Sequence, residues 1–278
     1  MMLRGATRHF CLLLIGILLA SCGSNDVRDG GPESGSTSIR DLPGDAVPRP
    51  EPRSRYGNGP VYEVFGKRYV VMNSSSGFKE RGVASWYGKK FHNKMTSMQE
   101  RYDMYAMTAA HKTLPLPSYV RVRNLSNNKS VVVRVNDRGP FVDNRIIDLS
   151  YSAALKLDIV RDGTSLVEIE AVGFDGPSGD RPVRRPTSPR SPAPPPATAN
   201  TNKVFVQVGA FSSRENANRL LGELKSGGIG RAFVIKDTSS NATLYRVRIG
   251  PINGVVQYDI LVEELENLGI SAPYLIIE

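Results

Sequence analysis

The chain has 278 residues, 36 lysines and arginines against 27 aspartates and glutamates, and two cysteines. This length suggests one large domain or two small ones, and a 40% apolar composition excludes a chain that is disordered throughout. The net charge of +9 is dispersed: residues 61–175 have a net charge of +5, residues 176–202 have +3, and residues 203–278 have a net charge of zero. Because no segment forms a dense basic patch, the charge does not indicate a nucleic-acid-binding protein.

The N-terminus has the pattern of an export signal. Arg4 and Arg8 precede an apolar run at residues 10–20, which has secretory length and is too short to span a bilayer. The run ends in Leu-Ala-Ser-Cys22, which resembles the lipobox of bacterial lipoproteins, whose cysteine becomes the first residue and carries lipid. The alternative is an ordinary signal peptide with an incidental cysteine. We expect a signal peptide at residues 1–21 and an outer-membrane lipoprotein that faces the periplasm, since Gly23 and not aspartate follows the cysteine.

Two segments have the composition of tethers. Residues 23–60 contain seven glycines and six prolines, and residues 176–202 contain eight prolines. Such segments bury too little apolar surface to fold, and the second favours extended polyproline II. We therefore expect a disordered tether at residues 22–60, a folded domain at residues 61–175, a Pro-rich linker at residues 176–202 and a second folded domain at residues 203–278.

The C-terminal domain shows an internal repeat of strand, helix and strand. Alternating residues predict strands at 203–209, 232–236, 244–250 and 273–278, and helical spacing of apolar residues predicts two helices between them. Ser212-x-x-Glu215 is typical of a capping box at the start of the first helix. The order predicts a βαββαβ, ferredoxin-like α+β fold.

One face of this predicted sheet is polar. Strand alternation places Phe205 and Gln207 on the same side as Arg246 and Arg248, away from the helices. The face is either a binding surface or a set of solvated residues on a free sheet. An RNA-recognition module shares the topology, but it needs stacked aromatic residues on its central strands, and a neutral exported domain with a single such ring does not favour RNA.

Two motifs of this domain resemble the SPOR family. They are Val-Gln-Val-Gly-Ala-Phe-Ser at residues 206–212 and Tyr-Arg-Val-Arg-Ile-Gly-Pro at residues 245–251. The resemblance implies binding to peptidoglycan glycan strands that lack stem peptides and are enriched at division septa. It also implies a set of glycan-binding residues, namely Gln207, Ser212, Arg246 and Arg248.

The central domain contains short strands at residues 82–88, 119–124 and 130–136, with a helix at 150–157, and this pattern favours a small, mainly β barrel. His92 and His111 lack the spacing of a metal site, and there is no phosphate loop or G-x-S-x-G motif, so we expect no metal and no cofactor. Carboxylates beside aromatic residues suit carbohydrate chemistry, although such residues also serve in turns and barrel cores. The carboxylates are Glu100, Asp103, Asp137, Asp143 and Asp148.

Four motifs of this domain, at residues 82–88, 108–118, 132–141 and 145–150, resemble the rare lipoprotein A family. The family resemblance implies a double-psi β-barrel, a fold shared with expansins and with a membrane-bound lytic transglycosylase family. It also implies an endolytic transglycosylase that cleaves the MurNAc–GlcNAc bond of peptide-free strands to 1,6-anhydro products at the septum. The implied catalytic residues are Asp137 as acid and base, Glu100 and His111. The implied substrate-binding residues are Trp86, Tyr87, Asp103 and Arg138.

Two positions depart from the family pattern. Gln99 and Asn93 replace common glycines near the expected cleft, so a loop that needs positive φ would be strained or remodelled, which affects the placement of Glu100. This departure keeps a second hypothesis open, namely a non-catalytic glycan-binding protein, as in expansins. A third is a structural lipoprotein that links the membrane to the septal wall and docks division-machinery proteins.

Overall fold

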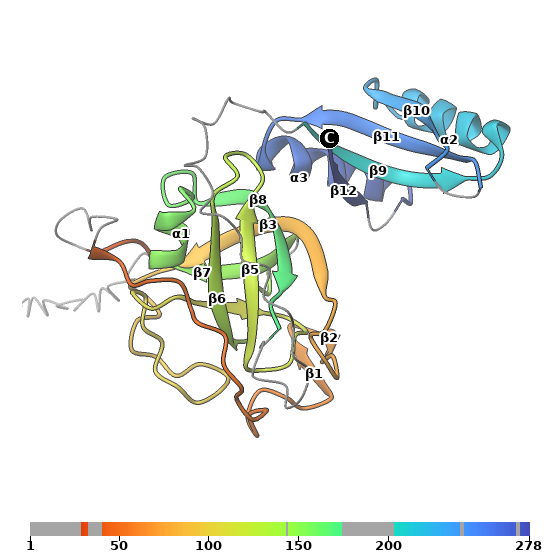
Figure 1. Ribbon diagram of the computed structural model, residues 1–278. Helices are drawn as coiled ribbons and strands as arrows, with labels where there is room; N and C mark the ends of the chain where they lie inside the picture. The colour runs from red at the N-terminus through yellow and green to blue at the C-terminus, as the bar shows by residue number, and fades with distance from the viewer. Residues whose placement is uncertain (1–28, 33–40, 143, 174–202, 240–241, 271–272) are drawn as a thin grey trace, which may run out of the picture.

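The computed structural model describes residues 29–32, 41–142, 144–173, 203–239, 242–270 and 273–278, which form a β-barrel and a smaller α/β region (Figure 1). Cys22, the signal peptide and the Pro-rich linker lie outside the described residues. Across the described ranges, no helix has both the length and the apolar character needed to cross a membrane.

Six strands close the barrel in the order β3-β7-β4-β6-β5-β8. Their bounds are β3 (Lys79–Tyr87), β4 (Thr108–His111), β5 (Ser118–Asn124), β6 (Ser130–Asp137), β7 (Arg145–Ser150) and β8 (Thr164–Ala171). The pairs β3–β7 and β4–β6 are parallel, and the other neighbours are antiparallel. Alternate valines fill the interior: Val131, Val133 and Val135 of β6 are each at most 3% exposed. The predicted small β-barrel is confirmed.

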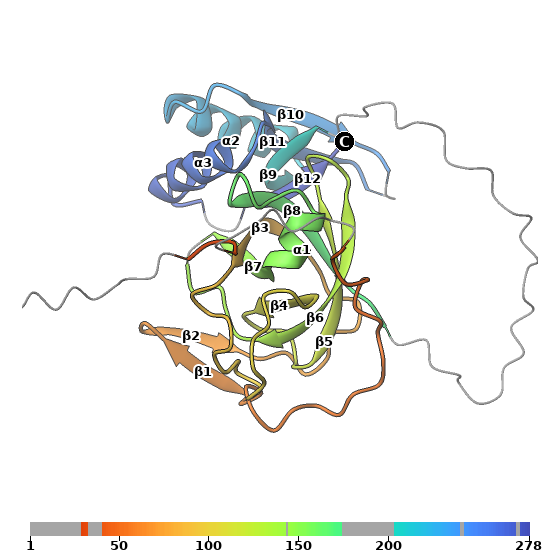
Figure 2. The same ribbon diagram turned by 90° about the vertical axis from the view of Figure 1, so that its left-hand side faces the viewer.

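Helix α1 (Tyr151–Lys156) follows β7 directly. The Ser150 side chain accepts the N–H of Ala153 and caps the helix, and both residues are fully buried. A hairpin of β1 (Val61–Val64) and β2 (Lys67–Val70) precedes the barrel and lies beside it (Figure 2).

The structure differs from the expected tether at residues 41–60. This N-terminal strap runs along the barrel: the Ala46 N–H donates to the Val132 carbonyl at 3.0 Å, and the Ser54 N–H donates to the Leu116 carbonyl at 2.9 Å. The expectation of a disordered tether rested on the low apolar content of this segment. The strap is instead held by backbone hydrogen bonds and by the ion pair between Glu51 and Arg134.

The C-terminal region is a four-stranded sheet of order β10-β11-β9-β12 with both helices on one face (Figure 2). The bounds are β9 (Val204–Phe211), α2 (Arg214–Ser226), β10 (Ala232–Asp237), β11 (Leu244–Ile252), α3 (Val255–Asn267) and β12 (Tyr274–Ile277). The predicted repeat is confirmed. The predicted capping box is wrong: the N-cap is Ser213 and not Ser212, so Asn216, whose N–H the Ser213 side chain accepts, takes the N3 position, and Glu215 accepts from the Ser213 hydroxyl instead.

Candidate functional site

Four residues form a line across neighbouring strands of the barrel. Asp137 on β6 is paired with Ala110 on β4, Ala110 is paired with Asp148 on β7, and Asp148 is paired with Ser85 on β3. Directly paired residues point to the same face of a sheet. We call this line the carboxylate row: Asp137, Ala110, Asp148 and Ser85.

The carboxylate row lies on the outer face of the barrel. Ile147 and Leu149, which flank Asp148, are fully buried in the core, so alternation turns Asp148 outward. Alternation along β6 alone would turn Asp137 inward with Val135. The register against β4 shifts at this point by one residue, a bulge at Asn136, and the shift turns Asp137 to the face of Asp148.

Asp148 has the environment of a general acid. The Ser85 hydroxyl donates a short hydrogen bond to its Oδ1, and Arg145 donates to the Ser85 oxygen at 3.0 Å. Burial raises the pKa of Asp148, and the nearby Asp137 raises it further, against the opposing effects of Ser85 and Arg145. A carboxyl with a raised pKa holds its proton closer to neutral pH, which proton donation to a leaving group requires.

Asp137 is held firmly through one oxygen. Its Oδ1 accepts the N–H and the hydroxyl of Ser97, both at 2.7 Å, and the N–H of Arg138 at 2.8 Å. Among the described residues, nothing donates to its Oδ2. The Arg138 side chain turns away and donates to the carbonyls of Gly57 at 2.8 Å and Leu114 at 2.6 Å. Asp137 therefore has a fixed orientation and no ion pair with Arg138 in the described chain.

Two small residues, Gly139 and Ala110, lie beside these carboxylates. Gly139 has a φ of 140°, and a Cβ at this position would lie 3.9 Å from Asp148 Oδ2 and 3.8 Å from the Ala110 Cβ. Ala110 itself separates the two aspartates in the row. A glycosidic oxygen can therefore approach Asp148 without meeting a large side chain from either position.

Glu100 is bound away from the row, to Arg134. The guanidinium donates to both carboxylate oxygens, at 2.7 and 3.0 Å, and Asn136 donates a third bond at 2.9 Å. Burial raises the pKa of Glu100, but the bonds from Arg134 and Asn136 outweigh it, and the pKa of this carboxyl is lowered. Arg134 also pairs with Glu51 of the strap at 2.8 Å. A carboxylate held in this way is suited to positioning and not to proton donation.

His111 and Tyr87 occupy interior positions, which differs from the expected place in a cleft. His111 is paired with the core residue Ile147 and is 2% exposed. Its Nδ1 accepts the N–H groups of Thr113 and Leu114 at 3.1 and 3.0 Å, and burial lowers its pKa. Tyr87 is 8% exposed and stacks on Tyr102 with ring centroids 4.0 Å apart. Strand alternation on β4 explains why His111 is buried, and ring packing against Tyr102 explains why Tyr87 is buried.

The other two candidates of the barrel are also engaged in local structure. Trp86 is half-buried and packs against Tyr151, with ring centroids 5.7 Å apart. Asp103 is exposed and accepts the N–H of Tyr105 at 2.9 Å, a local turn contact. Neither residue belongs to the carboxylate row.

The two departures from glycine both have positive φ. Gln99 has a φ of 64° and Asn93 a φ of 65°. The expected strain at Gln99 is present, at a cost of about 1–2 kcal/mol for a residue with a Cβ, whereas asparagine tolerates this conformation better. The turn is nevertheless closed, since the Gln99 N–H donates to the Thr96 carbonyl at 2.9 Å and Ser97 still reaches Asp137.

The polar sheet face of the C-terminal region follows the predicted alternation. Gln207 is directly paired with Arg248, and Arg246 lies two residues away on β11. Within the described chain, the buried Gln207 Oε1 and Arg248 Nε have no hydrogen-bond partner. Arg246 pairs with Asp237 at 2.6 Å, and Arg248 pairs with Glu278. Ser212 is exposed at the turn after β9. The face therefore carries two buried, unpartnered polar atoms beside two arginines that are held in ion pairs.

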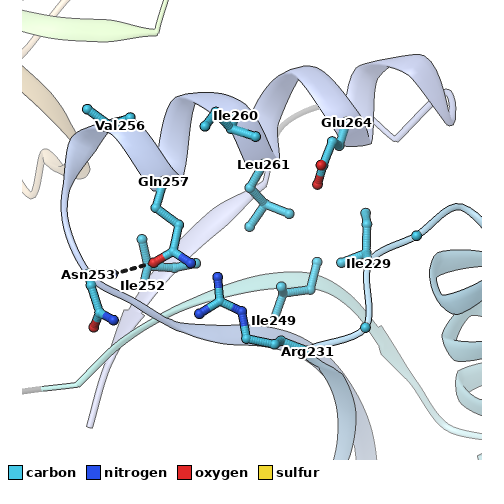
Figure 3. A pocket seen from close by; sticks show the side chains of 12 residues that line it. Ile229, Arg231, Ile249, Ile252, Asn253, Val256, Gln257, Ile260, Leu261 and Glu264 are labelled. Carbon is cyan, nitrogen blue, oxygen red and sulfur yellow. Dashed lines mark hydrogen bonds between the residues drawn. The ribbon is translucent and has the colours of Figure 1, made fainter.

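A separate cavity of about 530 Å³ lies on the helical side of this region, between α3 and residues 228–231 (Figure 3). Ile249, Ile252 and Leu261 form its apolar wall, and the Gln257 side chain accepts the N–H of Asn253 at 2.7 Å. The cavity contains none of the residues of the polar sheet face, so the two features are distinct.

The sequence indicates Asp148 only as one of five carboxylates without a role, and no motif points to Ser85 or Ser97. A usable signal is present for Asp148: a charged residue between two core residues of one strand, Ile147 and Leu149, must lie on the opposite face. The two serines have no such signal, because only the strand register and the closure of the Gln99 turn bring them to the aspartates.

Comparison with known proteins places these observations in a family. Residues 79–169 match the family profile described as lytic transglycolase, and residues 200–276 match the SPOR domain. The chain is 40% identical to the endolytic peptidoglycan transglycosylase RlpA of Vibrio cholerae over 96% of both chains. It is 35% identical to the RlpA protein of Pseudomonas aeruginosa over 90% of this chain and 84% of that one. The crystal structure of the RlpA SPOR domain from Pseudomonas aeruginosa aligns at 25% identity with a TM-score of 0.25, covering 26% of this chain and 96% of that one. The chain belongs to the RlpA family, with a double-psi β-barrel followed by a SPOR domain.

Proposed function

We propose that this protein is an endolytic lytic transglycosylase that cleaves MurNAc–GlcNAc bonds in peptide-free glycan strands and releases 1,6-anhydro products. The observation that carries the proposal is the carboxylate row, in which a half-buried Asp148 with a raised pKa shares one outer face with Asp137. The names of its relatives support the same reaction class. Membership of the RlpA family supports cell-wall glycan as the substrate.

The reaction needs one acid that can later act as a base. Asp148 donates its proton to the glycosidic oxygen as the C1–O4 bond breaks, and the oxocarbenium-like charge at C1 is stabilised by the carboxylate of Asp137. The carboxylate of Asp148 then takes the proton of the C6 hydroxyl as O6 bonds to C1. The anhydro ring closes, Asp148 regains its proton, and no water is consumed.

This assignment revises the expected roles. Asp137 remains in the site, but as the charged partner and not as the acid, because three donors fix its Oδ1. Glu100 and His111 act as positioning residues. Glu100 orders the Arg134 network, and the His111 carbonyl accepts a hydrogen bond from Arg138 at 3.0 Å.

The location of the activity is part of the proposal. The SPOR domain directs the enzyme to septal peptidoglycan through Gln207, Ser212, Arg246 and Arg248. The shared sheet face of Gln207, Arg246 and Arg248 and the exposure of Ser212 support this role. Cleavage after residue 21 and lipidation of Cys22 anchor the chain in the outer membrane, and the Pro-rich linker sets its reach. Division proteins are the candidate partners.

Isotope labelling of the products tests the reaction. Purified peptide-free strands are digested by the mature protein in H₂¹⁸O, and the products are analysed by mass spectrometry. Anhydromuramyl ends without ¹⁸O are expected, since O6 and not water attacks C1. Reducing ends that carry ¹⁸O indicate a hydrolase and contradict the proposal.

The second candidate is a glycan-binding protein without catalysis. The strain at Gln99 favours it, since a loop with φ of 64° at a residue with a Cβ is less firmly held than one with glycine. In that case the same strands bind and no product forms on long incubation.

A further inference from the structure

The β1–β2 hairpin and the segment after β6 enclose a cavity of about 440 Å³ next to the carboxylate row. The residues that line this hairpin pocket are Gly57, Gly59, Tyr62, Val64, Ser97, Arg138 and Phe141. The lytic transglycolase profile begins at residue 79, so the hairpin and the end of the strap lie outside it.

The wall of the hairpin pocket is built from fixed aromatic rings. Tyr62 stacks on Tyr69 with ring centroids 5.2 Å apart, and Phe141 meets both rings at 6.3 and 5.7 Å. The Tyr62 hydroxyl donates to the Lys112 carbonyl at 2.7 Å, which holds the ring against the barrel. Tyr69 covers one face of Tyr62, and the Arg138 guanidinium lies over the same ring, 5.8 Å from its centroid. Phe141 and the edge of Tyr62 are therefore the aromatic surfaces that can contact the C–H groups of a pyranose ring at little cost in side-chain entropy.

The floor of the hairpin pocket carries a positive charge that is not neutralised by an ion pair. Arg138 donates to four neutral oxygens, the carbonyls of Gly57, His111 and Leu114 and the side-chain oxygen of Asn58. No carboxylate among the described residues forms a salt bridge with it. Burial lowers the pKa of Arg138 to about 10, so the group stays charged at neutral pH. A guanidinium has five N–H groups, so one remains for an anionic ligand.

Ser97 connects this pocket to the reacting groups. It lines the hairpin pocket and donates both its N–H and its hydroxyl to Asp137. A sugar in the pocket would therefore be separated from Asp137 of the carboxylate row by a single residue, Ser97.

We propose that the hairpin pocket binds an N-acetylmuramic acid residue of the strand, with its pyranose ring against Phe141 and the edge of Tyr62 and its free lactyl carboxylate at Arg138. This inference rests on the proposed function and adds a specificity element to it. A stem peptide converts the lactyl carboxylate into a neutral amide and adds bulk that the pocket must exclude. The barrel itself, and not only the SPOR domain, would then select peptide-free strands.

Hydrogen–deuterium exchange of the full mature protein locates the binding directly. The probe is a tetrasaccharide of alternating GlcNAc and MurNAc with free lactyl groups, compared with the same tetrasaccharide amidated with L-alanine amide. Slower exchange is expected at residues 57–64 and 138–142 with the free probe and not with the amidated probe. Protection at residues 204–211 and 244–252 reports the SPOR domain separately, and mass spectrometry of the same samples reports cleavage.

The variant Tyr62→Ala is expected to raise KM for peptide-free strands about tenfold, the loss expected from one aromatic contact, with kcat almost unchanged. Tyr62→Leu keeps apolar bulk but lacks the aromatic ring, so the same rise in KM is expected, and this variant is used if the alanine variant does not fold. Phe65→Ala is the matched control, since Phe65 lies at the tip of the same hairpin and is 92% exposed.

Two results overturn the inference. Equal protection of residues 57–64 by the free and the amidated probe removes the role of the lactyl carboxylate. An unchanged KM in the folded Tyr62 variants shows that the hairpin pocket does not bind the substrate. Cleavage that proceeds without protection of the hairpin leaves the proposed function intact and rejects only the pocket, whereas protection without any cleavage rejects the proposed function and keeps the pocket.

Discussion

Replacing Glu51 by glutamine removes a charge that fastens the N-terminal strap to the barrel. The Glu51 carboxylate accepts hydrogen bonds from Arg134 at 2.9 and 2.8 Å and a short one from the Tyr119 hydroxyl. The hydrogen bonds from Arg134 lower the pKa of Glu51 from 4.5 to about 2. Glutamine has a similar shape, so Glu51→Gln changes the charge and leaves the packing almost unaltered.

The loss in free energy of unfolding expected for Glu51→Gln follows from this difference between the folded and unfolded pKa of Glu51. A lowering by this amount corresponds to about 3 kcal/mol of stability at neutral pH, and solvent screening of a side chain that is 17% exposed reduces it to about 2 kcal/mol. Because the pKa of Glu51 is lower in the folded state, the contribution is complete above pH 4.5 and is lost as the pH falls toward 2. The difference between wild type and Glu51→Gln should shrink to under about 1 kcal/mol at pH 3.

Urea unfolding followed by tryptophan fluorescence measures this directly, because the chain's single tryptophan, Trp86, lies in the barrel. The variant should unfold at lower urea than wild type at pH 7, with a smaller difference at pH 3. Glu63→Gln, an exposed carboxylate on β1, is the control and should match wild type. Equal stability of Glu51→Gln and wild type at pH 7, or an equal loss at both pH values, refutes the reasoning.

Three further predictions concern the site and the SPOR face. Ser85→Ala removes a donor that lowers the pKa of Asp148, so the alkaline limb of the pH–rate profile should move to higher pH, and an unmoved limb contradicts the role of Asp148. Gly139→Ala should lower the rate of product formation at least about tenfold, because the added methyl group would lie 3.9 Å from Asp148 Oδ2 and compete with the glycosidic oxygen for this space, whereas Gly163→Ala, which also has positive φ but open space around it, should cost stability only. Arg248→Gln should weaken binding of the full chain to peptide-free strands about tenfold in a co-sedimentation assay. Unchanged binding would show that the polar sheet face does not bind the strands.

Much of the fold was predictable because its signals are local. Alternation along residues 130–136 identified a barrel strand, and the repeat of strand, helix and strand identified the C-terminal sheet. The strap was not predictable from composition. Its backbone partners, such as Leu116, are far away in the sequence, and its key residue Glu51 is stabilised by charge and not by burial of apolar surface.

The site was predictable in residue type but not in geometry. The motifs identified Asp137, but the bulge at Asn136, which decides the face on which it lies, has no local signature. His111 was expected in the cleft because the family resemblance implied a catalytic role, yet its pairing with Ile147 turns it into the core. Asp148 became a candidate for the acid only when the register placed it in line with Asp137.

The most direct test of the central claim is the digestion of peptide-free strands by Asp148→Asn, with Asp137→Asn and the exposed Asp162→Asn measured in parallel. Anhydromuramyl ends are quantified by mass spectrometry, and binding to the strands is measured separately for each variant. Asp148→Asn should lower the rate by about a thousandfold while binding persists, Asp137→Asn should lower it less, and Asp162→Asn should match wild type. Full activity of Asp148→Asn contradicts its assignment as the acid.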